Sequence, residues 1–134
     1  MTQEEFIEVL DKKGYLHLVS IIGGNIILKG NGDIILNSIT SLPSGIIFKN
    51  TGKVELDSLT HISRGIEFQN RWFTSLNSLK SIPPGVVFDN GGDVYLNSLV
   101  KGTYLKSWEG TIEGINYKRL INKMISIGLF NRRR

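Results

Sequence analysis

A repeat of 20 residues, which recurs four times without an insertion or a deletion, limits this chain to a small set of folds. Residues of one kind return in the same phase in successive repeats. The apolar columns include Leu36, Leu56, Leu76 and Leu96, and also Leu28, Phe48, Phe68 and Phe88. The polar and glycine columns are Ser38, Ser58, Ser78 and Ser98, then Asn50, Asn70 and Asn90, then Gly45, Gly65 and Gly85. Because so short a repeat cannot bury its own apolar side, its neighbours must stack on it, and the period indicates a solenoid.

The residues within one repeat predict its local structure. In the repeat that spans residues 85–104, two short strands at 86–88 and 93–97 flank an Asp-Asn-Gly-Gly turn, and Val94 and Leu96 share one face of the second strand. Alternation with a period of two is typical of strands, and Asn-Gly and Pro are typical of corners. The fold class that we predict is mainly β, a short parallel β-solenoid. It has four coils of 20 residues, and coils stack about 4.8 Å apart.

The polar columns have a structural explanation. The asparagines at 50, 70 and 90 follow the first strand of the second, third and fourth coils, where asparagine tolerates a left-handed turn and can form side-chain ladders between stacked coils. The serines two residues after the leucine column are placed to cap backbone groups at the corners. We therefore expect these columns to stabilise the stack and not to take part in catalysis.

A stack of strands has two open ends, and the sequence predicts a helical cap at each. Thr2 and Glu5 form a capping-box pattern, and Gly14 can end a helix over residues 3–13. At the other end, Asn116 can cap a helix over 117–127, and Gly128 can end it. We expect one domain, 1–134, in which 1–24 form the N-terminal helix and cap, 25–104 the four-coil solenoid, and 105–134 the C-terminal cap helix and a basic tail.

The repeat also resembles a known group of proteins. Segments such as GIIFKNTGKVELDSL and GVVFDNGGDVYLNSL resemble the repeats of small leucine-rich-repeat-like proteins of bacteriophages and gut bacteria. The opening TQEEFIEVLDKKGY and the closing EGINYKRLINKMISIGLF are similar to the ends of those proteins. The resemblance implies an accessory protein that binds a host factor in the cytoplasm of the host cell, including one that inhibits host defence.

Composition agrees with a cytoplasmic protein. Cysteine is absent, which excludes disulfides and a thiolate metal site, and no run of apolar residues reaches the length of about 20 that a membrane span needs. The first residues are acidic, unlike those of a signal peptide. We expect no membrane partner, and a protein that is a monomer or a homodimer.

Positive charge is concentrated in the tail. Residues 1–116 carry ten cations and twelve acids, whereas residues 117–134 carry six cations and no acid. These six cations are Lys118, Arg119, Lys123, Arg132, Arg133 and Arg134. They can contact phosphate or an acidic partner, which leaves a nucleic-acid or nucleotide binder as an alternative function, or they can form a solvated tail.

The third coil departs from the repeat at its turn. It carries Arg71, Trp72 and Phe73 where the other coils have a tight turn that contains glycine. Trp and Arg are the residue types most enriched in binding hot spots. We predict a partner-binding site at Arg71, Trp72 and Phe73, beside Tyr95. The alternative is that the large aromatic residues pack over a neighbouring coil.

A second departure lies on the outward face of the first strand. The column there is apolar in three of four coils and consists of Ile27, Ile47, Glu67 and Val87. We expect another part of the same chain to cover it, because large exposed apolar patches are rare in monomers. The alternatives are the binding of a partner and a dimer contact, which would fit a structural component of a virion or an assembly.

No motif indicates an enzyme. His17 and His61 lie far apart in the chain, and nothing requires Glu55 and Asp57 to act as a catalytic pair. No HExxH, GxSxG or phosphate-loop motif is present. We therefore predict no catalytic residue, no metal site and no cofactor, and a non-enzymatic module that binds another protein.

Overall fold

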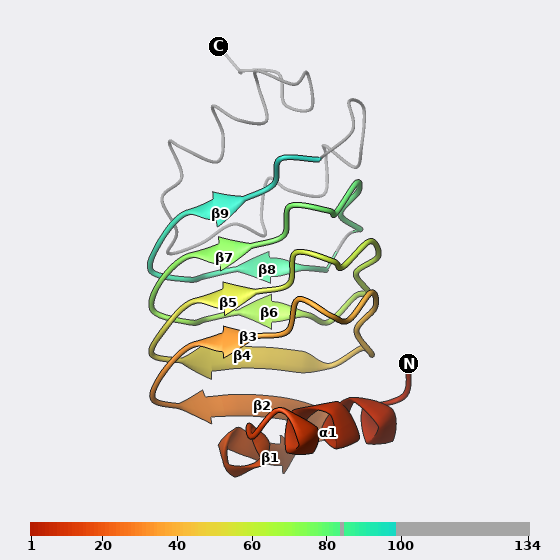
Figure 1. Ribbon diagram of the computed structural model, residues 1–134, viewed down its shortest axis with the longest axis vertical. Helices are drawn as coiled ribbons and strands as arrows, with labels where there is room; N and C mark the ends of the chain where they lie inside the picture. Colours follow the sequence, from red (N-terminus) through yellow and green to blue (C-terminus); the bar gives the residue numbers. More distant parts are fainter. Residues whose placement is uncertain (84, 99–134) are drawn as a thin grey trace.

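The computed structural model describes residues 1–83 and 85–98, and over these residues the chain is mainly β (Figure 1). It begins with one helix, α1 (Gln3–Lys12), and a short 3₁₀ helix, η1 (Leu16–Leu18). Nine strands follow: β1 (Val19–Ile22), β2 (Asn25–Gly30), β3 (Ile34–Ile35), β4 (Ile46–Asn50), β5 (Val54–Glu55), β6 (Glu67–Phe68), β7 (Thr74–Ser75), β8 (Val87–Phe88) and β9 (Val94–Tyr95). The chain coils upward from α1, so that each turn lies on the one before it.

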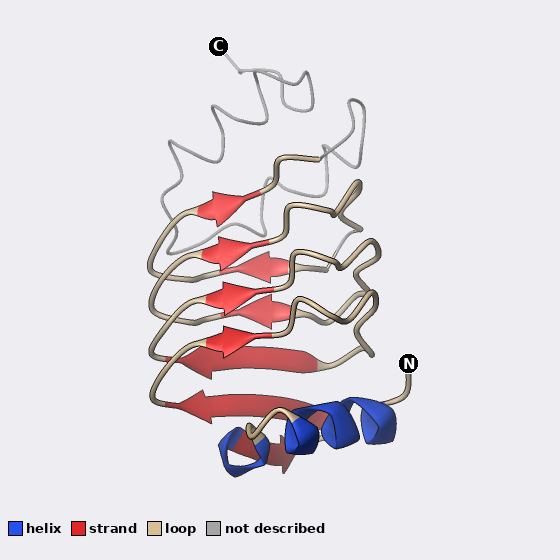
Figure 2. Ribbon diagram, in the orientation of Figure 1, coloured by secondary structure: helices blue, strands red, loops and turns tan. Residues whose placement is uncertain are grey.

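Two sheets form the walls of the coil (Figure 2). One has the strand order β1-β2-β4-β6-β8 and the other has the order β3-β5-β7-β9. From β2 onward every neighbouring pair is parallel, and register partners are 20 residues apart, as in Phe48 with Phe68 and Val54 with Thr74. This register confirms the β-solenoid. The two strands of the fourth coil are present, whereas residues 99–104 and the expected C-terminal helix lie outside the described residues.

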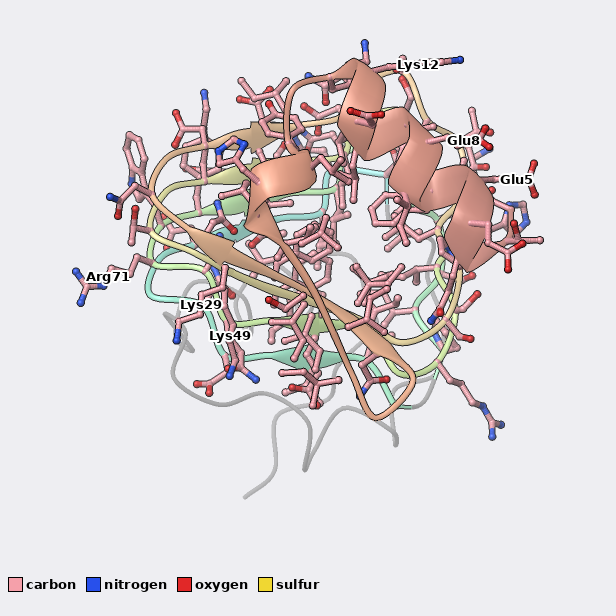
Figure 3. The ribbon with its side chains drawn as sticks, turned by 90° about the horizontal axis from the view of Figure 1, so that it is seen from below. Glu5, Glu8, Lys12, Lys29, Lys49 and Arg71 are labelled. Atoms are coloured by element: carbon pink, nitrogen blue, oxygen red, sulfur yellow. The ribbon has the colours of Figure 1, made fainter. Side chains whose placement is uncertain are left out.

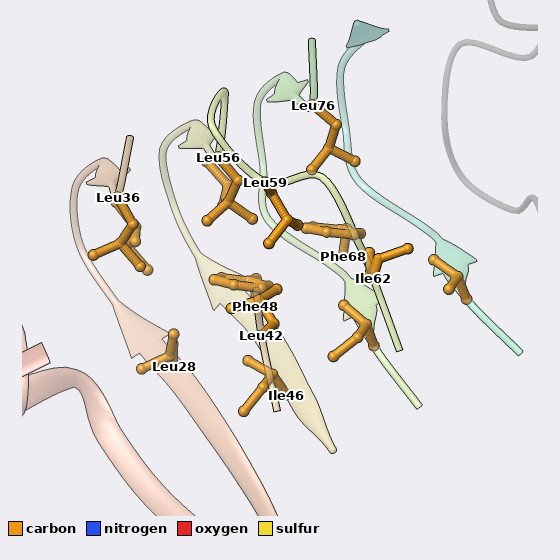
Figure 4. Packing of buried hydrophobic residues seen from close by; sticks show 14 of the residues in the cluster. Leu28, Leu36, Leu42, Ile46, Phe48, Leu56, Leu59, Ile62, Phe68 and Leu76 are labelled. Atoms are coloured by element: carbon orange, nitrogen blue, oxygen red, sulfur yellow. The ribbon is translucent and has the colours of Figure 1, made fainter. Parts of the chain in front are cut away.

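Stacked phenylalanines run through the centre of the solenoid. The rings of Phe48 and Phe68 are 5.2 Å apart at their centroids with 3° between their planes, and Phe68 and Phe88 are 5.2 Å apart with 7° between theirs. Leucine and isoleucine side chains from both walls surround the rings, and Figure 4 shows Leu42 and Ile62 beside them. All three phenylalanines are fully buried, so the aromatic column is the continuous core that the repeat predicts.

The buried asparagines hold successive coils together through the backbone. The Nδ2 of Asn50 donates to the carbonyl of Gly32 in the coil below and to that of Lys53 in its own coil, both at 3.0 Å. Asn70 and Asn90 repeat this pattern one and two coils higher. The expected structural role is confirmed, but the amides bond to carbonyls and do not form an amide-to-amide ladder.

A second polar column has the same function on the outer side of the β3–β9 sheet. The Oδ1 of Asn37 accepts from the backbone N–H of Asp57 at 2.9 Å, and the Oδ1 of Asp57 accepts from that of Asn77 at 3.1 Å. The Oδ1 of Asn77 accepts from the N–H of Asn97 at 3.4 Å. Beside it, the hydroxyl of Ser78 donates to the carbonyl of Asp57, which is the corner capping that the serine column predicts.

The N-terminal cap contains a helix and a hairpin. Thr2 and Glu5 form the expected capping box, and the helix buries Phe6 and Leu10 against the first coil. After η1, β1 pairs antiparallel with β2 through a turn in which Gly23 and Gly24 have φ of 59° and 82°. The sequence predicts a helix and cap over residues 1–24 but no strand there, so the hairpin is a feature that the structure adds. No helix among the described residues is long and apolar enough to span a bilayer.

The outward column of the first strand is in register but only partly covered. Ile27, Ile47, Glu67 and Val87 are register partners, and each is half-buried. In the end view of Figure 3, α1 lies on the side of the molecule opposite Lys29 and Lys49, which share the outer face of the sheet with this column. The N-terminal helix therefore does not provide the expected cover.

Candidate functional site

The exposed turn of the third coil carries Trp72 at the position of Gly32, Gly52 and Gly92. The side chain of Trp72 is 56% exposed, the largest exposed fraction of any aromatic side chain in the described chain. The coil above leaves room for this turn, since a Cβ added to Gly92 would lie 2.9 Å from the backbone of Trp72 and Phe73. Real Cβ atoms rarely approach so closely, so glycine at 92 allows the fourth coil to stack closely on the backbone of this turn.

Three aromatic side chains meet at this turn. The ring centroids of Trp72 and Phe73 are 5.1 Å apart with 68° between their planes, and those of Phe73 and Tyr95 are 5.3 Å apart with 69° between theirs. Both contacts have the edge-to-face geometry that aromatic pairs favour. We call Trp72, Phe73 and Tyr95 the aromatic cluster. Phe73 and Tyr95 are half-buried, so they support Trp72, which projects to solvent.

The structure thus brings together three of the four residues that the sequence predicts for the site. Phe73 packs on the coil above, as the alternative interpretation predicts, whereas Trp72 remains largely uncovered. Arg71 is exposed at the same turn, and its side chain makes no hydrogen bond or ion pair within the described residues. The role of the four residues in binding stays a prediction.

An ion pair lies next to the aromatic cluster. The Nζ of Lys53 is 2.7 Å from Oε2 of Glu55 and 5.5 Å from the ring centroid of Phe73. The hydrogen bond from Lys53, with a second from Asn37, lowers the pKa of Glu55, and the bond to Glu55 raises the pKa of Lys53. The pair therefore remains charged at neutral pH and fixes a cation over the face of Phe73.

Glu55 and Asp57, which nothing in the sequence requires to act as a catalytic pair, have separate structural partners. Glu55 is held by Lys53 and Asn37, whereas Asp57 accepts hydrogen bonds from the hydroxyl of Ser75 at 2.5 Å and from the backbone of Asn77. His61 is exposed, and its Nδ1 lies 3.1 Å from the hydroxyl of Thr60. Within residues 1–83 and 85–98, no three His, Asp or Glu side chains are grouped so that they could hold a metal ion.

Two surface features were not predicted from the sequence. Ile21 and Ile22 of the edge strand β1 are 61% and 62% exposed, and the signal for their hairpin was the Gly-Gly pair between two β-branched runs. Lys29 and Lys49 are register partners on β2 and β4, and the signal was their common phase. The six predicted contact cations of the tail lie outside the described residues.

Comparison with known proteins adds no relative to this description. No protein-family model, no curated protein sequence and no solved structure matches the chain.

Proposed function

We propose that this chain is a non-enzymatic module that binds another protein through a surface centred on the aromatic cluster. The observation that carries the proposal is Trp72, which projects to solvent from a turn where every other coil has glycine at this position. An exposed Trp on a small protein is typical of a binding hot spot, since burial of its ring on association is strongly favourable.

The scaffold supports this function by holding the surface rigid. The turn that carries Trp72 is bonded to the coil below through the N–H of Arg71 and the carbonyl of Asn50, at 3.1 Å. Asn70 fixes the same turn from inside, because its Nδ2 donates to the carbonyls of Trp72 and Phe73. A surface that is ordered before binding loses little conformational entropy when it associates.

The resemblance of the repeats to phage proteins supports a narrower form of the proposal. The partner would then be a protein of the host cell, met in the host cytoplasm, and inhibition of host defence is one outcome of such binding. Capture from the host cell identifies this partner.

The test is affinity capture from a lysate of the host cell, with a variant that restores the repeat. Trp72→Gly places at 72 the residue of the other coils and removes an exposed side chain, so it should change the free energy of unfolding by about 1 kcal/mol or less. We expect it to weaken capture by about 30-fold or more, as for a hot-spot residue.

Two variants serve as controls. Trp72→Phe keeps an aromatic ring and should retain much of the captured protein. Ile21→Ser removes another exposed apolar side chain, at the opposite end of the described coils, and should capture as much as wild type. Equal capture by wild type and Trp72→Gly would exclude the aromatic cluster as the binding site.

A further inference from the structure

We propose that the partner contacts this surface with an acidic segment of its polypeptide chain, which lies along a row of cations beside the aromatic cluster. The inference rests on the proposed function and names the chemistry of the partner. The row consists of Lys29, Lys49 and Arg71, which we call the cationic edge. All three side chains are exposed, and Figure 3 shows them on the same side of the molecule.

The two lysines are placed where the fold alone does not favour them. Lys29 and Lys49 are direct register partners on the parallel strands β2 and β4, and neighbouring strands are about 4.8 Å apart. Like charges directly opposite each other destabilise a sheet. Neither lysine has an ion pair with another described residue, whereas Lys53 is paired with Glu55. A pair that costs stability and has no counterion among the described residues fits an external anion.

The cationic edge is continuous with the aromatic cluster. Arg71 precedes Trp72 in the turn, and the backbone N–H of Arg71 bonds to the carbonyl of Asn50, the residue after Lys49. A partner bound over Trp72 therefore reaches Arg71 and then Lys49 and Lys29 by crossing two coils. Two coil spacings are about 10 Å, which three residues of an extended peptide span.

Charge also decides between classes of occupant. Residues 99–134 carry eight cations and two acids, so the chain's own C-terminal stretch has the same sign of net charge as the cationic edge and is disfavoured as its complement. A second copy that docked through the same surface would bring the cationic edge onto itself. Nucleic acid is disfavoured for two reasons. Residues 1–98 carry ten acids and eight cations, so this part of the chain has a negative net charge. The row is also flanked by the exposed acids Asp33 in the first coil and Asp89 in the fourth.

The experiment is a selection of random dodecapeptides, displayed on a carrier, against immobilised full-length protein. We expect the selected peptides to contain Asp or Glu next to an aromatic or aliphatic residue. In binding titrations with a synthetic copy of a selected peptide, the double variant Lys29→Gln/Lys49→Gln should weaken binding by about 3- to 10-fold and reduce its dependence on salt.

A second double variant controls for net charge. Lys12→Gln/Lys80→Gln removes two exposed cations elsewhere, and Lys12 lies on the opposite side in Figure 3, so this variant should bind the peptide like wild type.

Binding that is lost in Trp72→Gly but unchanged in Lys29→Gln/Lys49→Gln would overturn the acidic partner and leave the proposed function standing. A selection that returns no binder to wild type would overturn the proposed function and this inference with it. A labelled oligo-dT probe that binds at the cationic edge, where acidic peptides do not, would assign the surface to nucleic acid instead.

Discussion

The hydroxyl of Thr74 donates a hydrogen bond of 3.2 Å to the Oδ1 of Asn70, and both side chains are buried. In the second and fourth coils the residue at the position of Thr74 is Val54 or Val94, and the Oδ1 atoms of Asn50 and Asn90 have no partner among the described residues. The third coil, which carries the aromatic cluster, is thus the coil whose buried amide is fully bonded.

This difference predicts opposite effects for two exchanges of valine and threonine. Thr74→Val leaves the buried Oδ1 of Asn70 without a donor, so it should lower the free energy of unfolding by about 1–3 kcal/mol. Val54→Thr supplies a donor beside Asn50, so it should leave the free energy of unfolding unchanged or raise it. Denaturant titration of both variants measures the free energy of unfolding. Equal decreases in the two variants would show that the threonine hydroxyl does not stabilise the asparagine amide by a hydrogen bond.

The ion pair beside the aromatic cluster predicts a pH dependence. Because the pKa of Glu55 is lowered in the folded protein, the pair stabilises the fold above the unfolded value of 4.5 and loses this contribution as the pH falls through the folded pKa. The pKa of Lys53 is raised, so its contribution is present below 10.5 and is lost as the pH rises through the folded pKa.

Denaturation midpoints of wild type and Glu55→Gln, followed against pH, test this dependence. Glutamine mimics the protonated carboxyl, so the difference between the two proteins should be constant at neutral pH and disappear in acid. A difference that persists at the acid end would mean that Glu55 stabilises the fold by some means other than its charge.

The sequence predicted the architecture because a strict period fixes which residues lie over one another. The columns of Phe48 and Asn50 could be assigned from phase alone, without knowledge of the path of the chain. The direction of an individual polar side chain does not follow from phase. The bonds from Asn50 to two carbonyls, and the column that begins at Asn37, therefore required the structure.

The same limit applies to the candidate site. The exchange of glycine for Trp72 is visible in the sequence as a break in the repeat, and so is the aromatic neighbour Phe73. The antiparallel strand β1 lies before the first repeat, where no column constrains it. The phase places Lys29 beside Lys49 as well, but it does not show that neither lysine has an ion pair among the described residues, and that observation required the structure.

The phenylalanine core predicts a large loss of stability on truncation. Phe68 is fully buried between two stacked rings, so Phe68→Ala should lower the free energy of unfolding by about 3–5 kcal/mol. Phe68→Leu keeps part of the volume and should remain folded if the alanine variant does not. Phe73→Leu is the matched control on the outer surface, and a loss as large as that of Phe68→Leu would contradict the central position of the stack.

The stacking of coils in register underlies every surface described above, and contacts between the phenylalanine rings test it most directly. In a sample with protons on the phenylalanine rings alone, nuclear Overhauser spectra should show cross-peaks from Phe48 to Phe68 and from Phe68 to Phe88, whose centroids are 5.2 Å apart. Phe48 and Phe88, separated by a coil, should show none. Each assignment can be made with a Phe→Leu variant. Absence of both expected cross-peaks, with the three rings in unrelated environments, would contradict the solenoid.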